Sequence, residues 1–232
     1  MPRKRPPDRL DHILDAAQRV FARTGLERSK MSDVAAEAGV SQGTLYNYVE
    51  SKEALFRLLL DRGLGGSLPL QVELPVRGPS HDVLAARMEE AVTSSFELPK
   101  LDEALRRRRV TDARAELAGI IDELFERTVA TREAADALER SALDVPELAA
   151  VFYGNVRSGL FDRFALLLRK RSESGHYRRT DSPAIARMIV ESVTMFGRHI
   201  YNDREPPGFD LVAGRRAVRD LLVDGLVVGA GR

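Results

Sequence analysis

The chain has 232 residues, with 36 basic and 35 acidic side chains and no cysteine. This length allows one large domain or two modest ones, and the missing cysteine excludes disulfides and thiolate metal sites. The net charge of +1 is too small to indicate a nucleic-acid partner by itself.

The first residues are basic and rich in proline. They lack the apolar core of a signal peptide, and no apolar run in the chain approaches the length that spans a bilayer. We therefore expect a soluble, cytoplasmic protein with no membrane partner. Arg3, Lys4 and Arg5 form either a disordered tail or an arm that lies along phosphates or in a minor groove.

The first predicted helix covers residues 8–24, where apolar side chains recur with helical spacing from Leu10 to Phe21. Gly25 follows the last of them, in the position where a glycine commonly ends a helix. Ser29 is then expected to cap a second, short helix whose inner face consists of small apolar residues.

A sharp turn and a third helix come next. Gly39 stands where the chain must reverse its direction, and Ser41 is a suitable N-cap for the helix that follows. Leu45 and Val49 are four residues apart, so both would face inward. Ser51 then caps a fourth helix. A helix, a glycine turn and a short second helix in this order are typical of a helix-turn-helix.

The outward face of the third helix carries amide, hydroxyl and phenol groups, and no charge before Glu50. Gln and Asn can pair with adenine edges in the major groove. Hydroxyls and the free amides of a helix N-terminus suit phosphate oxygens, and Lys52 in the next helix is well placed to meet a phosphate. Tyr46 and Tyr48 could instead be packing aromatics. The predicted DNA-binding residues are Ser41, Gln42, Gly43, Thr44, Tyr46, Asn47, Tyr48 and Lys52.

Residues 9–59 resemble the DNA-binding domain of the TetR family of bacterial transcriptional regulators. The resemblance is carried by residues 13–17, by Val20, Phe21 and Gly25, by residues 33–35, and by the run AGVSQGTLYNYVESKEAL. It implies that the second and third helices form the helix-turn-helix and that the third enters the major groove.

The resemblance also assigns roles to individual positions. It implies base contacts at Gln42 and Asn47, and it implies phosphate contacts at Thr44, Tyr46, Tyr48 and Lys52. Val49 departs from the pattern, because the family usually has Phe there. The smaller side chain would loosen the packing beneath the third helix without changing the fold.

Residues 39–43 also match G-x-S-x-G, the nucleophile elbow of α/β-hydrolases. That motif requires a strand before the serine, whereas residues 30–38 are alanine-rich with helical spacing. His81, His176 and His199 come with no further sign of a catalytic triad. We therefore expect no enzyme, and a hydrolase remains only as the alternative outside DNA binding.

Beyond residue 66 the resemblance fades. Residues 64–79 are rich in Gly and Pro, which is typical of a linker. Further helices are predicted over residues 80–98, 102–109, 112–143, 146–172, 182–203 and 210–228. The predicted fold class is all-α. A helix-turn-helix domain is expected over residues 8–66, and a helical effector-binding and dimerisation domain over residues 80–229.

The last two predicted helices have apolar surfaces too wide for one stripe, so each is expected to be buried on two sides. A two-fold homodimer also suits DNA reading, because one short helix covers only half of a site. The resemblance implies the same pairing, in a four-helix bundle with a second subunit. A monomer with a well-buried final helix is the alternative. The last helix carries Val212, Val218, Leu221, Leu222, Val223, Leu226, Val227 and Val228.

The resemblance further implies a small-molecule cavity among the C-terminal helices, and ligand binding there would move the two recognition helices out of register with the operator. Aromatic residues are candidate lining, although aromatics at helical spacing are more often plain core. Arg106–Arg109 could receive an anionic ligand or form a solvated helix end. The candidates for the effector pocket are Phe96, Phe125, Phe152, Tyr153, Asn155, Phe161 and Met195.

These patterns show no metal-ligand spacing and no glycine-rich phosphate loop, so we expect neither a metal nor a cofactor. The residues and the resemblance together predict a transcriptional repressor that responds to an unknown small-molecule effector and binds a palindromic double-stranded operator as a homodimer. The alternative within DNA binding is a regulator without an effector, either an activator or a protein controlled by a partner.

Overall fold

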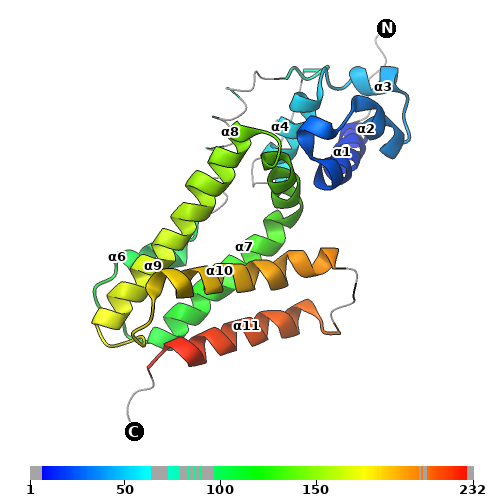
Figure 1. Ribbon diagram of the computed structural model, residues 1–232. Helices are drawn as coiled ribbons and strands as arrows, with labels where there is room; N and C mark the ends of the chain where they lie inside the picture. The colour runs from blue at the N-terminus through cyan, green and yellow to red at the C-terminus, as the bar shows by residue number, and fades with distance from the viewer. Residues whose placement is uncertain are drawn as a thin grey trace. The chain divides into compact units, whose positions relative to one another are not determined.

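The computed structural model describes residues 7–63, 73–78, 97–203 and 208–228, together with Val83, Ala86, Glu89 and Glu205. These residues form helices joined by turns and two isolated bridges, and no strand occurs among them (Figure 1). The predicted all-α class is therefore confirmed.

The chain divides into two compact units. The first contains residues 1–95 and 133–156, and the second contains residues 96–132 and 157–232. Helix α7 (Ala113–Ala142) contributes to both, since its last ten residues belong to the first unit. The domain boundaries expected from the sequence, residues 8–66 and 80–229, stay a prediction.

The first unit begins with four helices: α1 (Pro7–Arg28), α2 (Met31–Glu37), α3 (Gln42–Tyr46) and α4 (Lys52–Gly63). The apolar face of α1 is buried against α2 and α4. Phe21 of α1 meets Phe56 of α4 edge to face, with ring centroids 5.6 Å apart. This aromatic contact joins the first and fourth helices beneath the helix-turn-helix.

The start of α2 differs from the prediction. Lys30, not Ser29, is its N-cap, and the Lys30 backbone N–H donates to Asp33 Oδ2 at 3.0 Å. Ser29 is buried and donates its hydroxyl to the Gly25 carbonyl at 2.5 Å. Gly25 has φ of 78° and lies inside α1, which continues to Arg28 beyond the kink. The serine therefore stabilises this kink rather than the next helix.

The last part of the first unit comes from far along the chain. The end of α7 is followed by α8 (Pro146–Ala149) and by a π-helix over Ala150–Arg157. Arg28 pairs with Asp144 at 2.8 Å, and Gln18 donates to Glu133 at 2.5 Å. These contacts attach residues after 133 to α1.

The second unit consists of the first part of α7 with α6 (Pro99–Arg106), α9 (Ser158–Glu173), α10 (Ser182–Gly197), a 3-10 turn (His199–Asn202) and α11 (Leu211–Leu226). Figure 1 shows α11 running beside α10. The core of this unit is built from aliphatic residues and phenylalanines of all five α-helices, including Leu101, Ile121, Phe164, Ile189 and Val218.

Several predicted helices differ from those observed. The helix expected over residues 182–203 ends at Gly197 and is followed by the 3-10 turn. The helix expected over residues 146–172 is interrupted by the π-helix between α8 and α9. The helix expected over residues 102–109 begins earlier, because Pro99 occupies the first helical turn, where its missing N–H costs nothing. The helix expected over residues 80–98 lies almost entirely outside the described residues. None of the helices described here is long and apolar enough to cross a bilayer.

Candidate DNA-binding interface

The recognition helix α3 is fixed by local contacts that the sequence predicted. Gly39 turns the chain with φ of 63°. Ser41 caps the helix, since its Oγ accepts a hydrogen bond from the Thr44 N–H at 3.1 Å. Leu45 is fully buried, as expected for its inward position, and α3 packs against α2. The opposite face is therefore held toward solvent.

This outward surface carries most of the predicted DNA-binding residues. Ser41, Gln42, Gly43, Tyr46 and Asn47 are exposed, and Thr44 is half-buried beside the Ser41 hydroxyl, 2.9 Å away. Except for Gly43, each of these residues has an uncharged side chain that can donate or accept hydrogen bonds. The surface thus has the chemistry that pairs with base edges and phosphate oxygens.

Tyr48 does not lie on this surface. Its side chain is only 4% exposed, whereas the sequence pattern placed it outward. The physical reason is that Tyr48 comes three residues after Leu45 and directly before Val49, so it lies on the same buried side as these two residues. A DNA contact from Tyr48 stays a prediction.

Lys52 forms a contact with α1 inside the first unit. Its Nζ donates to the Glu27 carbonyl at 2.9 Å and lies 3.5 Å from Glu27 Oε2. Ser51 caps α4 as expected, because its Oγ accepts the Ala54 N–H at 3.2 Å. An ammonium group has three donors, so the proposed phosphate contact of Lys52 stays open beside this bond.

The carboxylate of Glu37, at the end of α2, is paired with two arginines of α1. Arg19 and Arg23 each bind one carboxylate oxygen of Glu37 at 2.7 Å. Hydrogen bonds from these two guanidinium groups lower the pKa of Glu37 below its usual value. These arginines are therefore occupied within the unit.

One segment beside the recognition helix was missed by sequence reasoning. Residues 73–78 lie in the Gly- and Pro-rich stretch predicted to be a linker, but Val76 pairs with Val49 in an isolated parallel bridge. The side chain of Val76 is 3% exposed. A single valine among prolines and glycines gives no local signal for this long-range pairing.

The motif G-x-S-x-G has no hydrolase geometry here. A helix and a glycine turn precede Ser41. The strand that a nucleophile elbow needs is thus replaced by α2. Within the described part of the chain, no group of three His, Asp or Glu side chains is arranged to hold a metal ion.

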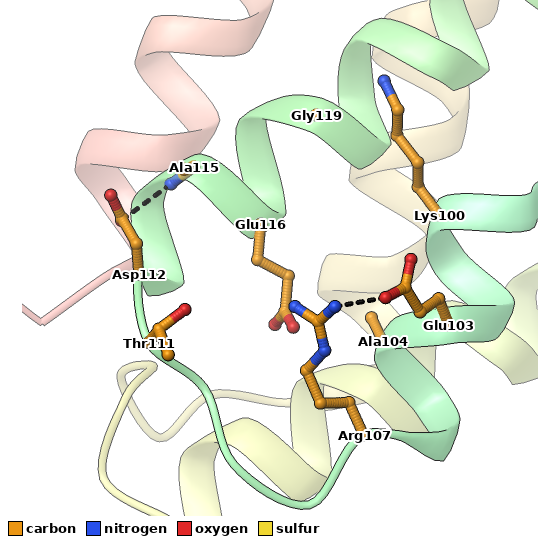
Figure 2. Close-up of a pocket in the computed structure, with 9 residues that line it drawn as sticks. All are labelled: Lys100, Glu103, Ala104, Arg107, Thr111, Asp112, Ala115, Glu116 and Gly119. Atoms are coloured by element: carbon orange, nitrogen blue, oxygen red, sulfur yellow. Dashed lines mark hydrogen bonds and ion pairs between the residues drawn. The ribbon is translucent and has the colours of Figure 1, made fainter.

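The second unit contains a pocket of about 380 Å³ between α6 and the start of α7. Figure 2 shows Glu103 on α6 and Arg107, the residue that follows α6, reaching toward Glu116 on α7, with an ion pair between the first two. Asp112 at the rim caps α7, accepting the Ala115 N–H at 2.9 Å. The walls combine charged side chains with apolar surface and are formed by Lys100, Glu103, Ala104, Arg107, Thr111, Asp112, Ala115, Glu116 and Gly119.

Behind this pocket lies a buried ion pair. The guanidinium group of Arg171 binds both carboxylate oxygens of Glu116, at 2.7 and 2.9 Å, and also donates to the Ala104 carbonyl. The hydrogen bond with Glu116 raises the pKa of Arg171 above its usual value. Both charges are satisfied, so the pair fixes α9 to α6 and α7.

The aromatic residues predicted for an effector pocket are not gathered at this polar pocket. Phe125 is buried in the core of the second unit, Phe161 lies under Arg157 and Arg187, and Met195 is exposed on α10. Three other candidates belong to the π-helix region of the first unit.

In that region Phe152 and Tyr153 meet edge to face, with ring centroids 4.9 Å apart. Asn155 is exposed and donates to Glu89 at 2.7 Å. Phe96 lies outside the described residues. The predicted aromatic pocket stays a prediction.

Comparison with known proteins agrees with this geometry. Residues 13–59 match the family model of bacterial regulatory proteins, tetR family. An uncharacterized HTH-type transcriptional regulator of Bacillus subtilis, YfiR, is 45% identical over 56 residues, which are 24% of this chain and 27% of that protein. The fatty acid metabolism regulator protein of the same organism is 38% identical over 65 residues, 28% of this chain and 32% of that protein. The chain thus spans about a third or less of the length of these curated relatives.

Solved structures share the fold over nearly the whole chain. The ketosteroid transcriptional regulator of Mycobacterium tuberculosis superposes with a TM-score of 0.61 at 16% identity, covering 97% of both chains. A transcriptional regulator from Saccharomonospora viridis, solved with choline, gives a TM-score of 0.52 at 18% identity, covering 96% of this chain and 100% of that one. Residues 13–59 therefore form a helix-turn-helix domain that is similar to the DNA-binding domain of the tetR family of bacterial regulatory proteins.

Proposed function

We propose that this protein is a transcriptional repressor that binds a palindromic operator as a homodimer in the bacterial cytoplasm and releases it when a small molecule binds. The observation that carries the proposal is the outward surface of α3. Gln42 and Asn47 are exposed there on a helix that Leu45 anchors, and an adenine edge can accept and donate the hydrogen bonds that such amides offer.

Dimerisation is supported by an exposed apolar stripe on each of the last two long helices. On α10, Ala184, Met188 and Met195 share one face, and Met188 is 56% exposed. On α11, Ala213, Ala217 and Leu221 recur every four residues, and Leu221 is 75% exposed. Small and apolar side chains at helical spacing allow another helix to approach closely, so a second copy of the chain would cover these stripes.

An effector site is supported by the pocket between α6 and α7. Its volume of about 380 Å³ lies in the range of small-molecule sites, about 300–1,000 Å³. The walls carry both signs of charge, including Lys100 and Asp112, which suits a polar ligand with charged ends better than an acyl chain. The regulator from S. viridis with a similar fold was solved with choline, a small cation.

A second candidate function is a regulator without a small-molecule effector, controlled by a protein partner or acting as an activator. The buried Arg171–Glu116 pair favours it, because that pair already satisfies one of the pocket's carboxylates without a ligand. The DNA-binding surface would be the same in both cases.

Selection of binding sites from a random double-stranded DNA library tests the proposal. We expect the full-length protein to enrich a palindrome, because two copies of α3 would read two half-sites. The matched control is a Gln42→Ala, Asn47→Ala double variant, which should enrich no sequence. The selected DNA then allows a screen of small polar compounds for release. Enrichment of no sequence by the wild type would contradict the proposal.

A further inference from the structure

Residues 76–78 form a docked segment beside the recognition helix, within the first unit. The Val76 N–H donates to the Tyr48 carbonyl at 2.8 Å, and the Glu50 N–H donates to the Val76 carbonyl at 2.9 Å. The Val76 side chain is buried beside Val49. The segment is therefore held by backbone and side-chain contacts to the residues that connect α3 with α4.

Gly78 brings the segment directly onto the N-terminus of α4. A Cβ atom at this position would clash with Ser51 Oγ and lie 3.4 Å from the Ala54 nitrogen. Only glycine permits this close approach without movement of the serine that caps α4. Arg77 is thus positioned between two fixed neighbours, next to the start of α4.

The side chain of Arg77 is 88% exposed, and its Nε lies 3.7 Å from Glu50 Oε1. An ion pair this open to water contributes little to stability, since solvent screens both charges. The guanidinium group is therefore available to a stronger anion. A DNA phosphate is such an anion, because it accepts two parallel hydrogen bonds from arginine.

The helix-turn-helix needs such a cation. Residues 31–60 contain two basic side chains, Lys52 and Arg57, against four acidic ones, a net charge of −2. Lys52 is bonded to Glu27, and Arg57 has its Nε buried without a hydrogen-bond partner among the described residues. A positive charge from outside this stretch would therefore strengthen the attraction of this surface to a polyanion.

We propose that Arg77 binds a phosphate of the operator beside the N-terminus of α4, and that residues 76–78 are an extension of the DNA interface that positions it. This inference rests on the proposed DNA-binding function. It assigns a DNA contact to a segment outside the helix-turn-helix, where the sequence indicated a linker.

The test measures DNA affinity against salt concentration for wild type, Arg77→Ala and Arg77→Lys on the selected site and on random duplex. Removing one phosphate contact per subunit lowers the slope of log K against log salt by about 0.9, so a dimer should lose about 1.8. For each lost contact, a tenfold rise in salt should therefore weaken DNA binding of the variant about eightfold less than it weakens binding of the wild type. Arg77→Lys keeps the charge and should keep most of the slope.

Two further variants distinguish the effect of where Arg77 is held from the effect of its charge. Arg108→Ala removes an exposed arginine of the second unit and should leave the slope unchanged. Gly78→Val displaces the segment while Arg77 remains, so it should reproduce the slope loss of Arg77→Ala. Circular dichroism of each variant verifies that the helices are retained.

The outcomes distinguish this inference from the proposed function. If the wild type binds no DNA, the proposed function fails and the inference fails with it. If the wild type binds its selected site and Arg77→Ala has the same slope and affinity, only the role of Arg77 is overturned. A loss on the selected site alone, at unchanged slope, would overturn the phosphate contact in favour of base reading.

Discussion

Ser141 accepts a hydrogen bond from the backbone N–H of Leu26 at 2.9 Å, and this bond ties the end of α7 to the last turn of α1 within the first unit. Both residues are buried. The serine hydroxyl in turn donates to the Ala137 carbonyl at 2.6 Å. A helix that begins in the second unit is thereby attached to the helix that supports the helix-turn-helix.

Replacing this serine should destabilise the protein. In Ser141→Ala the N–H of Leu26 keeps its burial and loses its acceptor, which costs about 1–3 kcal/mol. Chemical unfolding measures the change. Ser174→Ala is the control, because Ser174 is exposed and also bonds a carbonyl of its own helix, and we expect less than half the effect. Equal losses in both variants would contradict the importance of the Leu26 contact.

Gly25 should tolerate no side chain. Its φ is 78°, and a Cβ would lie 3.0 Å from the Arg140 carbonyl oxygen. Gly25→Ala is therefore expected to cost about 1–3 kcal/mol of unfolding free energy through backbone strain, in addition to the close contact. Gly159→Ala is the matched control.

Gly159 lies in α9 with no atom near its missing Cβ. Alanine there should stabilise the helix by about 0.5–1 kcal/mol. Thermal unfolding of the two variants should thus shift in opposite directions. A neutral Gly25→Ala would show that the kink in α1 can relax.

The sequence allowed α3 and its N-cap to be predicted because their signals are local. Gly39, Ser41 and Leu45 act on residues no more than a few positions away. Tyr48 was misplaced because its polar hydroxyl suggested a DNA contact, although its position three residues after Leu45 puts it on the buried side with Val49. The docking of Val76 could not be predicted, since it depends on a partner 27 residues earlier in a stretch that reads as a linker. The polar pocket likewise depends on how α6 meets α7, which no local pattern encodes.

Gln42 is expected to read a base. Its exposed amide on α3 can form a bidentate pair with adenine, so Gln42→Ala should weaken operator binding by about 1–3 kcal/mol per half-site. Binding to random DNA should stay nearly unchanged, because the residue carries no charge. Competition titrations on both duplexes measure the ratio. An equal loss on the two would argue against base reading.

The exposed stripe on α11 should govern assembly. Leu221→Asp places a charge in the centre of the proposed contact between subunits, where burial without a partner is costly. We expect the variant to sediment as a monomer and to lose operator binding, since one half-site alone is too weak. Leu143→Asp changes another exposed leucine, in the first unit, and should remain dimeric. Identical sedimentation of both variants and wild type would exclude α11 from the interface.

Tyr177 should make the folded protein sensitive to alkali. Its hydroxyl is buried without a hydrogen-bond partner among the described residues, and burial raises the pKa of this tyrosine far above its usual value, assisted by the negative charge of Glu116. In the unfolded chain the Tyr177 hydroxyl ionises near pH 10, whereas in the folded chain it stays neutral at that pH. The contribution of neutral Tyr177 to the free energy of unfolding is therefore fully present below pH 10. Above pH 10 the free energy of unfolding falls by up to about 1.4 kcal/mol per pH unit.

Tyr177→Phe removes both the ionisation and the unsatisfied hydroxyl. We expect the variant to match or exceed the wild type in urea unfolding at pH 7, and its advantage to grow between pH 10 and 11. The difference in unfolding free energy at pH 7 serves as the internal reference, because residue 177 is uncharged in both proteins at that pH. A parallel loss of stability in both proteins above pH 10 would mean that the hydroxyl finds a partner or reaches water in solution.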